Sequence, residues 1–310
     1  MTTPSPSLRW GVNLPLPAVE LRDHRRTVQA LPDLGYTDVW TGEGGGIDAF
    51  TPLAAAAAWQ PKLRVGTGVV PAQTRGTGVL ASTALTLSQL AQGGVLLGIG
   101  SSVPAHVTAL NGLPHTKPLE TVRRTVRALR EELAGRPPKV IVGALRPKML
   151  RLAYEEGDGA ILNLLGARDV PTVIGAAGGP YPDRETVVKI FLCPTPDAEA
   201  ARQAGRGFLG WILNQKPYHA FHEWLGRGDA LKASYERYEA GDRYGAALAL
   251  PDEVIDELWL HGDPGELREK IQQFVHPGVT TVLLYVAPTA ELAARPDRLP
   301  ELLAQLRPAT

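Results

Sequence analysis

The sequence of 310 residues has a single cysteine, Cys193, so no disulfide can form within the chain. It has no run of about 20 apolar residues, the length that a membrane-spanning helix needs. The segment from Met1 to Leu8 lacks the apolar core of a signal peptide. These absences argue against a disulfide-stabilised secreted protein and against a membrane protein, so we expect a cytoplasmic protein with no membrane partner.

The chain also lacks an excess of charge of either sign. Lysine and arginine together number 32, and aspartate and glutamate together number 32. Because nucleic acids and anionic membranes are bound mainly through an excess of positive charge, neither is an expected partner. A small-molecule ligand fits this composition better.

Short apolar or β-branched runs recur along the chain, and helical spacing follows most of them. Several runs, such as Val95–Ile99, show no polar alternation, which is typical of parallel strands that are buried on both faces. Eight such runs in a chain of this length predict one α/β domain over residues 1–310, a (β/α)8 TIM barrel. The predicted strands are Trp10–Asn13, Asp38–Thr41, Arg64–Val69, Val95–Ile99, Val140–Val142, Ala160–Asn163, Val187–Leu192 and Thr281–Val286.

Helices are predicted between these strands, and one connection is much longer than the others. The predicted helices are Glu20–Leu34, Gly78–Gln92, Pro118–Leu133, Pro147–Glu156 and Asp263–Val275. About 65 residues, 195–259, separate the seventh strand from the approach to the eighth, so we predict a helical insertion there. Within it, His219 and His222 have helical spacing, but no third ligand is spaced beside them, and no metal site is predicted.

Glycine-rich segments follow several predicted strands, at the end of a TIM barrel where ligands bind. They are residues 42–46, 66–69, 98–102 and 143–148. Glycine lets a flat or anionic ligand approach the main chain, which suits a bulky planar cofactor. Ser101 and Ser102 could bind a phosphate or form a simple turn. Arg146 could add charge at a helix start or be solvated there.

Five stretches, in the same order along the chain, resemble the luciferase-like flavin and deazaflavin oxidoreductases. The resemblance is strongest to the branch that uses coenzyme F420, and it does not discriminate well between F420 and FMN. The stretches are Gly35–Glu43, Leu63–Val69, Gly98–Ser102, Pro147–Ala153 and Gly157–Ala160.

The resemblance implies where the cofactor binds. It places Glu43 near the cofactor ring, and it implies a cis peptide bond without proline at Gly68–Val69. It assigns the cofactor's phosphate tail to the loop after the fourth strand and to the helix start after the fifth. With these loops, the expected cofactor-binding residues are Glu43, Gly68, Val69, Gly100, Ser101, Ser102, Gly143, Ala144, Leu145 and Arg146.

Two positions depart from the pattern of the sugar-phosphate dehydrogenases in this family. Those enzymes place a histidine directly after the residue equivalent to Glu43, and a carboxylate or histidine after the serines of the fourth strand. Gly44 and Val103 stand at these positions and cannot exchange a proton. The departures favour reduction of an activated C=C, C=N or C=O bond over oxidation of a sugar-phosphate alcohol.

Other side chains are therefore candidates for the proton donor. These are Glu43, His106, Tyr218 and His219. Residues of these types are more often packed in the protein or exposed on its surface than used for proton transfer. Arg75 and Asn163 are the candidate substrate-binding residues. For Arg75, a surface ion pair is an equal alternative.

The leading hypothesis is an F420-dependent oxidoreductase that transfers hydride to or from a small organic substrate. An FMN-dependent two-component monooxygenase, with a flavin reductase as partner, is the alternative, and a non-catalytic flavin-binding protein is the third. A flavin-free phosphosugar barrel is disfavoured because no lysine is recognised at a strand end. The resemblance also implies a homodimer and, for the leading hypothesis, an F420 reductase as a further partner.

Overall fold

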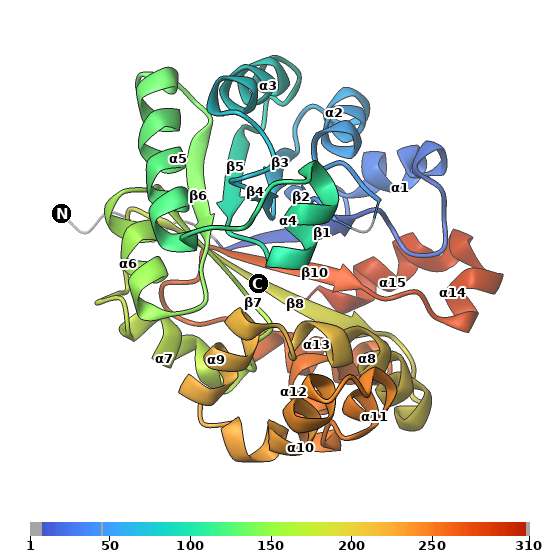
Figure 1. Cartoon of the computed structure of the whole chain (residues 1–310). Coiled ribbons are helices and arrows are strands. Elements are labelled where there is room, and N and C mark those ends of the chain that lie inside the picture. Colours follow the sequence, from blue (N-terminus) through green and yellow to red (C-terminus); the bar gives the residue numbers. More distant parts are fainter. Residues whose placement is uncertain (1–7, 45, 308–310) are drawn as a thin grey trace.

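Eight parallel strands form a closed barrel in the computed structural model, which describes residues 8–44 and 46–307 (Figure 1). Each strand pairs in parallel with its neighbour, and β10 closes the ring by pairing with both β1 and β8. In ring order the strands are β1 (Arg9–Leu14), β2 (Asp38–Thr41), β3 (Arg64–Thr67), β5 (Val95–Gly100), β6 (Lys139–Gly143), β7 (Gly159–Asn163), β8 (Glu185–Cys193) and β10 (Thr281–Val286). Two short strands, β4 (Val70–Pro71) and β9 (Leu260–His261), pair with β5 and β8. The predicted (β/α)8 barrel is confirmed.

Helices surround the barrel, and their apolar faces pack against the strands (Figure 1). Those outside the long insertion are α1 (Arg25–Ala30), α2 (Phe50–Trp59), α3 (Thr77–Leu90), α4 (Pro104–Asn111), α5 (Pro118–Leu133), α6 (Pro147–Glu155), α7 (Val170–Gly175), α13 (Pro264–Gln272), α14 (Ala290–Ala294) and α15 (Leu299–Leu306). Three 3-10 turns complete them, η1 (Leu21–Asp23), η2 (Ala167–Asp169) and η3 (Pro296–Arg298). Helix α5 has the predicted bounds, because Val122, Val126 and Leu129 recur on one buried face.

The predicted helix Glu20–Leu34 is instead divided into η1 and α1. The buried ring of His24 lies at the break, where Nε2 accepts from the Leu16 amide at 2.6 Å. Its Nδ1 contacts the Glu20 carbonyl at 2.7 Å. Helix α1 then ends at Ala30, because Pro32 has no N–H to donate to the Val28 carbonyl and continue the helical hydrogen bonds.

The long connection after β8 is helical, as predicted. It contains α8 (Ala198–Ile212), α9 (Lys216–Trp224), α10 (Gly228–Glu239), α11 (Arg243–Leu248) and α12 (Asp252–Leu258), the yellow-to-orange group in Figure 1. These helices enclose a second apolar cluster that includes Leu209, Leu231 and Ile255. The insertion begins and ends at one place, because the Gly262 amide donates to the Thr195 carbonyl at 3.0 Å. Among the described residues, no helix is long and apolar enough to cross a membrane.

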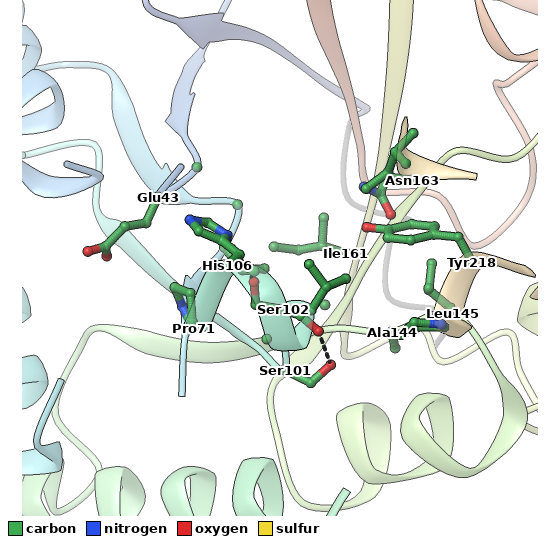
Figure 2. A pocket seen from close by; sticks show the side chains of 18 of the residues that line it. Glu43, Pro71, Ser101, Ser102, His106, Ala144, Leu145, Ile161, Asn163 and Tyr218 are labelled. Carbon is green, nitrogen blue, oxygen red and sulfur yellow. Dashed lines mark hydrogen bonds between the residues drawn. The ribbon is translucent and has the colours of Figure 1, made fainter. Parts of the chain in front are cut away.

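The interior of the barrel is filled by large apolar side chains. The six inner residues are Trp40, Leu96, Ile141, Ile161, Val187 and Leu283. Gly66 makes room for the Trp40 indole, since a Cβ there would lie 2.4 Å from the ring. Ile161 also faces the cavity at the carboxyl end of the strands (Figure 2). This layer separates that cavity from the opposite end of the barrel.

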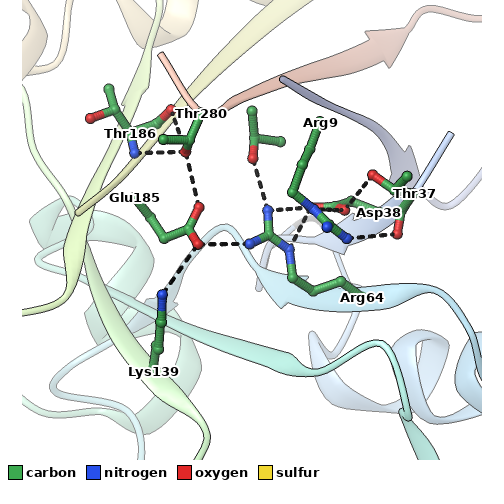
Figure 3. Close-up of polar contacts among 9 residues, drawn as sticks. Arg9, Thr37, Asp38, Arg64, Lys139, Glu185, Thr186 and Thr280 are labelled. Carbon is green, nitrogen blue, oxygen red and sulfur yellow. Dashed lines mark hydrogen bonds and ion pairs between the residues drawn. The ribbon is translucent and has the colours of Figure 1, made fainter. Parts of the chain in front are cut away.

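Ion pairs close the amino-terminal end of the barrel (Figure 3). Buried Asp38 accepts from Nε of Arg9 at 2.8 Å and from Nε of Arg64 at 2.7 Å. Arg64 also donates to Glu185 at 2.9 Å, and Lys139 lies 3.5 Å from the same carboxylate. Burial opposes ionisation of Glu185, but Arg64 and its other partners outweigh burial and lower its pKa. With this end closed, the carboxyl end is the open face of the barrel.

Candidate functional site

A cavity of about 220 Å³ opens at the carboxyl end of the strands (Figure 2). One wall comes from the loops after β2, β3, β5 and β6, and the other comes from β7, β8 and the insertion. The lining residues are Gly42, Glu43, Gly68, Val69, Pro71, Gly100, Ser101, Ser102, Val103, His106, Gly143, Ala144, Leu145, Ile161, Asn163, Lys189, Trp211, Ile212, Pro217 and Tyr218. The cavity therefore brings together all but one of the expected cofactor-binding residues; the exception is Arg146.

In the wall formed by the loops after β2, β3, β5 and β6, the Val69 side chain packs against Gly100 and Gly143. The Gly68–Val69 peptide bond is cis, as the resemblance implied. A Cβ on Gly100 would lie 2.5 Å from Cγ2 of Val69, and a Cβ on Gly143 would lie 2.9 Å from its Cγ1. Since carbon atoms in contact normally stay 3.5–4.0 Å apart, only glycine fits at these two positions without a shift. The two glycines therefore make room for the Val69 side chain, and all three residues line this wall of the cavity.

Hydroxyl and imidazole groups lie beside this valine. Ser102, with a φ of 56°, contacts Nδ1 of His106 through its Oγ at 3.0 Å. The Ser101 carbonyl contacts Nε2 of His115 at 3.0 Å. Both serines come directly after β5, and the first turn of α4 carries His106. His106 was a candidate from the sequence, but helix α4, which places its side chain at the cavity, was not predicted.

His106 occupies the space beside Gly44. A Cβ on Gly44 would lie 3.1 Å from Cε1 of the imidazole and 3.6 Å from its Nε2. Gly44 is the position where the sugar-phosphate dehydrogenases of the family were expected to have histidine. The chain therefore has an imidazole next to this position, but it comes from α4 instead of the loop after β2.

Glu43 is bound by Arg75. Nη2 of Arg75 donates to the Glu43 carboxylate at 2.9 Å and to Asp48 at 2.5 Å, and the guanidinium lies over the Phe50 ring. In Figure 2 the Glu43 carboxylate points away from the centre of the cavity. Arg75 is not among the lining residues, so its position matches the ion-pair alternative, not the predicted substrate contact. A carboxylate held in this way accepts hydrogen bonds and is poorly placed to donate a proton.

The opposite wall carries three polar side chains, those of Asn163, Lys189 and Tyr218. The Tyr218 side chain reaches it from α9, and its hydroxyl faces Asn163 at the end of β7 (Figure 2). Burial raises the pKa of Tyr218, and the contact with Asn163 offsets part of this effect. Asn163 pairs with Lys189 in the β7–β8 register, so both side chains project to the same side of the sheet. Both line the cavity.

Lys189 was missed in the sequence analysis. It stands in the run Val187–Leu192, which was predicted to be a strand, but no lysine was recognised at a strand end. A lone lysine in such a run was the available signal, because a buried charge is uncommon without a function or a partner. Burial lowers its pKa to about 8. The insertion residues Trp211, Ile212 and Pro217 were also missed, since only folding brings them to the barrel mouth.

Besides Arg75, two candidate residues lie away from the cavity. His219 stacks on the Tyr235 ring and lies 3.3 Å from Glu223. Consecutive helical residues point about 100° apart, so Tyr218 can face the cavity while His219 faces away. Arg146 is exposed at the amino-terminal cap of α6. Within the described parts of the chain, no group of three or more His, Cys, Asp or Glu side chains is arranged to hold a metal ion.

Known proteins share both the sequence pattern and the fold. The family model described as luciferase-like monooxygenase matches residues 7–281. A 5,10-methylenetetrahydromethanopterin reductase of Archaeoglobus fulgidus is 24% identical over 309 aligned positions, which cover 89% of this chain and 92% of the relative.

Solved structures show the same architecture. A coenzyme F420-dependent tetrahydromethanopterin reductase of Methanopyrus kandleri superposes with a TM-score of 0.73 at 19% identity, covering 97% of this chain and 98% of the other. An F420-dependent secondary alcohol dehydrogenase in complex with an F420–acetone adduct gives 0.70 at 16% identity, covering 97% and 99%. At these identities the likeness shows the fold. From the family match over most of its length, the chain belongs to the luciferase-like monooxygenase family of oxidoreductases.

Proposed function

We propose that the chain is a coenzyme F420-dependent oxidoreductase acting on a small organic substrate at this cavity. The observation that supports it most is the wall around Val69, where small residues and two serines line one side of the cavity. Such a surface fits a flat ring with a phosphate tail. When bound, the deazaflavin would supply or accept a hydride.

The expected cofactor-binding residues divide by chemistry. Gly68, Val69, Gly100 and Gly143 offer a flat surface for the ring. Ser101 and Ser102 offer hydroxyl groups to the phosphate tail, with Ala144 and Leu145 beside them. Exposed Arg146 at the start of α6 adds positive charge where a helix amino terminus already favours an anion.

His106 is the proposed proton carrier. Ser102 holds Nδ1 at 3.0 Å, and Nε2 has no hydrogen-bond partner within residues 8–44 and 46–307. A histidine held through one ring nitrogen can donate or accept a proton at the other. Tyr218 is the second candidate, across the cavity from His106 (Figure 2).

The proposed substrate has an activated C=C, C=N or C=O bond. Gly44 and buried Val103 stand where the sugar-phosphate dehydrogenases of the family have titratable side chains, so that arrangement for a sugar-phosphate alcohol is not reproduced. A carbonyl is consistent with the fold relative whose structure holds an F420–acetone adduct.

Equilibrium binding of F420 and of FMN to the purified chain tests the cofactor. We expect F420 to bind more tightly than FMN. Ser101→Ala should weaken F420 binding about five- to tenfold through loss of a hydrogen bond to a charged group. The matched control is Ser82→Ala, on an exposed part of α3, which should leave binding unchanged.

The outcomes separate the alternatives. Tight FMN binding without F420 binding would instead support the two-component monooxygenase. Cofactor binding without turnover of enones, imines or carbonyls would support a non-catalytic flavin-binding protein. Binding of neither cofactor would overturn the proposal.

A further inference from the structure

We propose that Lys189 anchors a carboxylate of the substrate at the floor of the cavity, so that the substrate class is an unsaturated or carbonyl acid. The inference rests on the proposed function, because it takes this cavity as the active site. It adds a specificity-determining residue and the chemical class of the group that this residue binds.

The position of Lys189 supports a ligand contact. It lies within β8, two residues after Val187, whose side chain belongs to the inner apolar layer. Because side chains alternate along a strand, Lys189 also points into the barrel, one step closer to the mouth. It lines the cavity beside Ile161 and Asn163. A cation at this depth can reach a ligand, and it is only partly exposed to solvent.

Within the described part of the chain, nothing neutralises the charge of Lys189. Among the described residues, no carboxylate forms an ion pair with Nζ and no side chain hydrogen-bonds to it. Its neighbours are the aromatic rings of Phe191 and Tyr285, whose centroids lie 5.4 and 5.5 Å from Nζ. Such contacts stabilise a cation only modestly compared with a hydrogen-bonded carboxylate. An anion from the ligand would neutralise the charge.

Neighbouring groups indicate a carboxylate. The Asn163 amide and the Tyr218 hydroxyl face each other in the same wall and could each donate one hydrogen bond. One cation with two neutral donors matches a planar monoanion with two oxygens. A phosphate dianion would call for more positive charge than this wall supplies.

The wall also favours the substrate over the cofactor. Lys189, Asn163 and Tyr218 come from β8, β7 and the insertion, whereas the expected cofactor-binding residues follow β2, β3, β5 and β6. In Figure 2 Tyr218 and Asn163 lie across the cavity from Glu43 and His106. If the carboxylate of a substrate binds to Lys189, the reactive bond of that substrate can face the opposite wall, which contains Val69 and the expected cofactor-binding residues.

The pH dependence has a defined sign. The titratable groups that line the cavity with Lys189 are Glu43, His106 and Tyr218, and Tyr285 packs against it. Burial lowers the pKa of Lys189 to about 8 and raises those of both tyrosines. Lys189 is therefore cationic below pH 8, and its affinity for an anion should fall as the pH rises through that value.

Calorimetric titration of the purified chain tests the anchor with two probes of equal shape, benzoate and benzamide. At pH 6.5 we expect benzoate to bind at least about tenfold more tightly, since hydrogen bonds to charged groups are the strong ones. Lys189→Met should abolish this preference, and Lys189→Arg should keep part of it. Lys216→Met, at an exposed position on α9 outside the cavity, is the matched control and should keep it all.

Further readouts separate this inference from the proposed function. Lys189→Met should bind F420 within about threefold of the parent and unfold at the same or higher temperature, since it replaces a partly buried cation, which has no carboxylate partner among the described residues, with an apolar side chain. A benzoate preference that survives Lys189→Met, or one absent from the parent, would overturn the anchor. Loss of F420 binding in Lys189→Met would also overturn it, by assigning the lysine to the cofactor. A lysine-dependent preference in a chain that binds no F420 would support the anchor and refute the proposed function.

Discussion

The contact between Gly100 and Val69 gives a quantitative test of the cavity wall. In Gly100→Ala the new Cβ would lie 2.5 Å from Cγ2 of Val69, about 1 Å inside normal carbon–carbon contact. Val69 cannot simply rotate away, because its Cγ1 already packs against Gly143. Overpacking of this kind costs about 1–3 kcal/mol, so we expect a loss of about 2 kcal/mol in the free energy of unfolding.

Val69→Ala removes both γ carbons, and the closest remaining contact is Cβ to Cβ at 3.3 Å. In that background Gly100→Ala should cost less than about 1 kcal/mol, which gives a favourable coupling of about 1–2 kcal/mol in a double-mutant cycle. Urea unfolding of the four proteins measures it. Gly207→Ala is the matched control, because its Cβ meets no atom within 4 Å and alanine should stabilise α8 by about 0.5–1 kcal/mol. Additive losses in the cycle would refute the packing argument.

Two further predictions concern the proton carrier and the closed end of the barrel. His106→Gln should lower kcat about 10²–10⁴-fold with F420 affinity unchanged, as measured by cofactor oxidation with a carbonyl substrate; an unchanged kcat would assign the proton to Tyr218. The pKa of Glu185 is lowered in the folded chain, so its ionised form stabilises the fold above its ordinary pKa of 4.5, and this contribution is lost as the pH falls below that value. Glu185→Gln should therefore flatten the dependence of urea stability on pH between about 6 and 3, and an equally steep dependence in the variant would contradict the ion-pair assignment.

Local patterns predict most of the barrel. Val95–Ile99 differs from β5 by one residue, because an uninterrupted apolar run leaves few other structures available. Helix α4 escaped prediction because its sequence, PAHVTALN, has almost no apolar periodicity, and Val107 is its one buried residue. The cis bond at Gly68–Val69 was expected from the resemblance alone.

Contacts within the site depend on pairings that no local pattern contains. Arg75 and Glu43 are 32 residues apart, and nothing in either segment indicates that they form an ion pair. The significance of Lys189 depends on its register with Asn163 across β7 and β8. The sequence could therefore supply candidate residues, but the division of the cavity into two walls required the fold.

The hydrogen bond between Gly262 and Thr195 has a consequence for the evolution of substrate range. The Gly262 amide nitrogen lies 3.0 Å from the Thr195 carbonyl oxygen, so the insertion leaves the barrel and returns to it at nearly the same point, as a short loop would. A segment of different length or shape could be exchanged there without disturbing the ring of strands or the glycine wall. A change of the insertion alone could then alter which substrates bind, while the wall with the expected cofactor-binding residues stays unchanged.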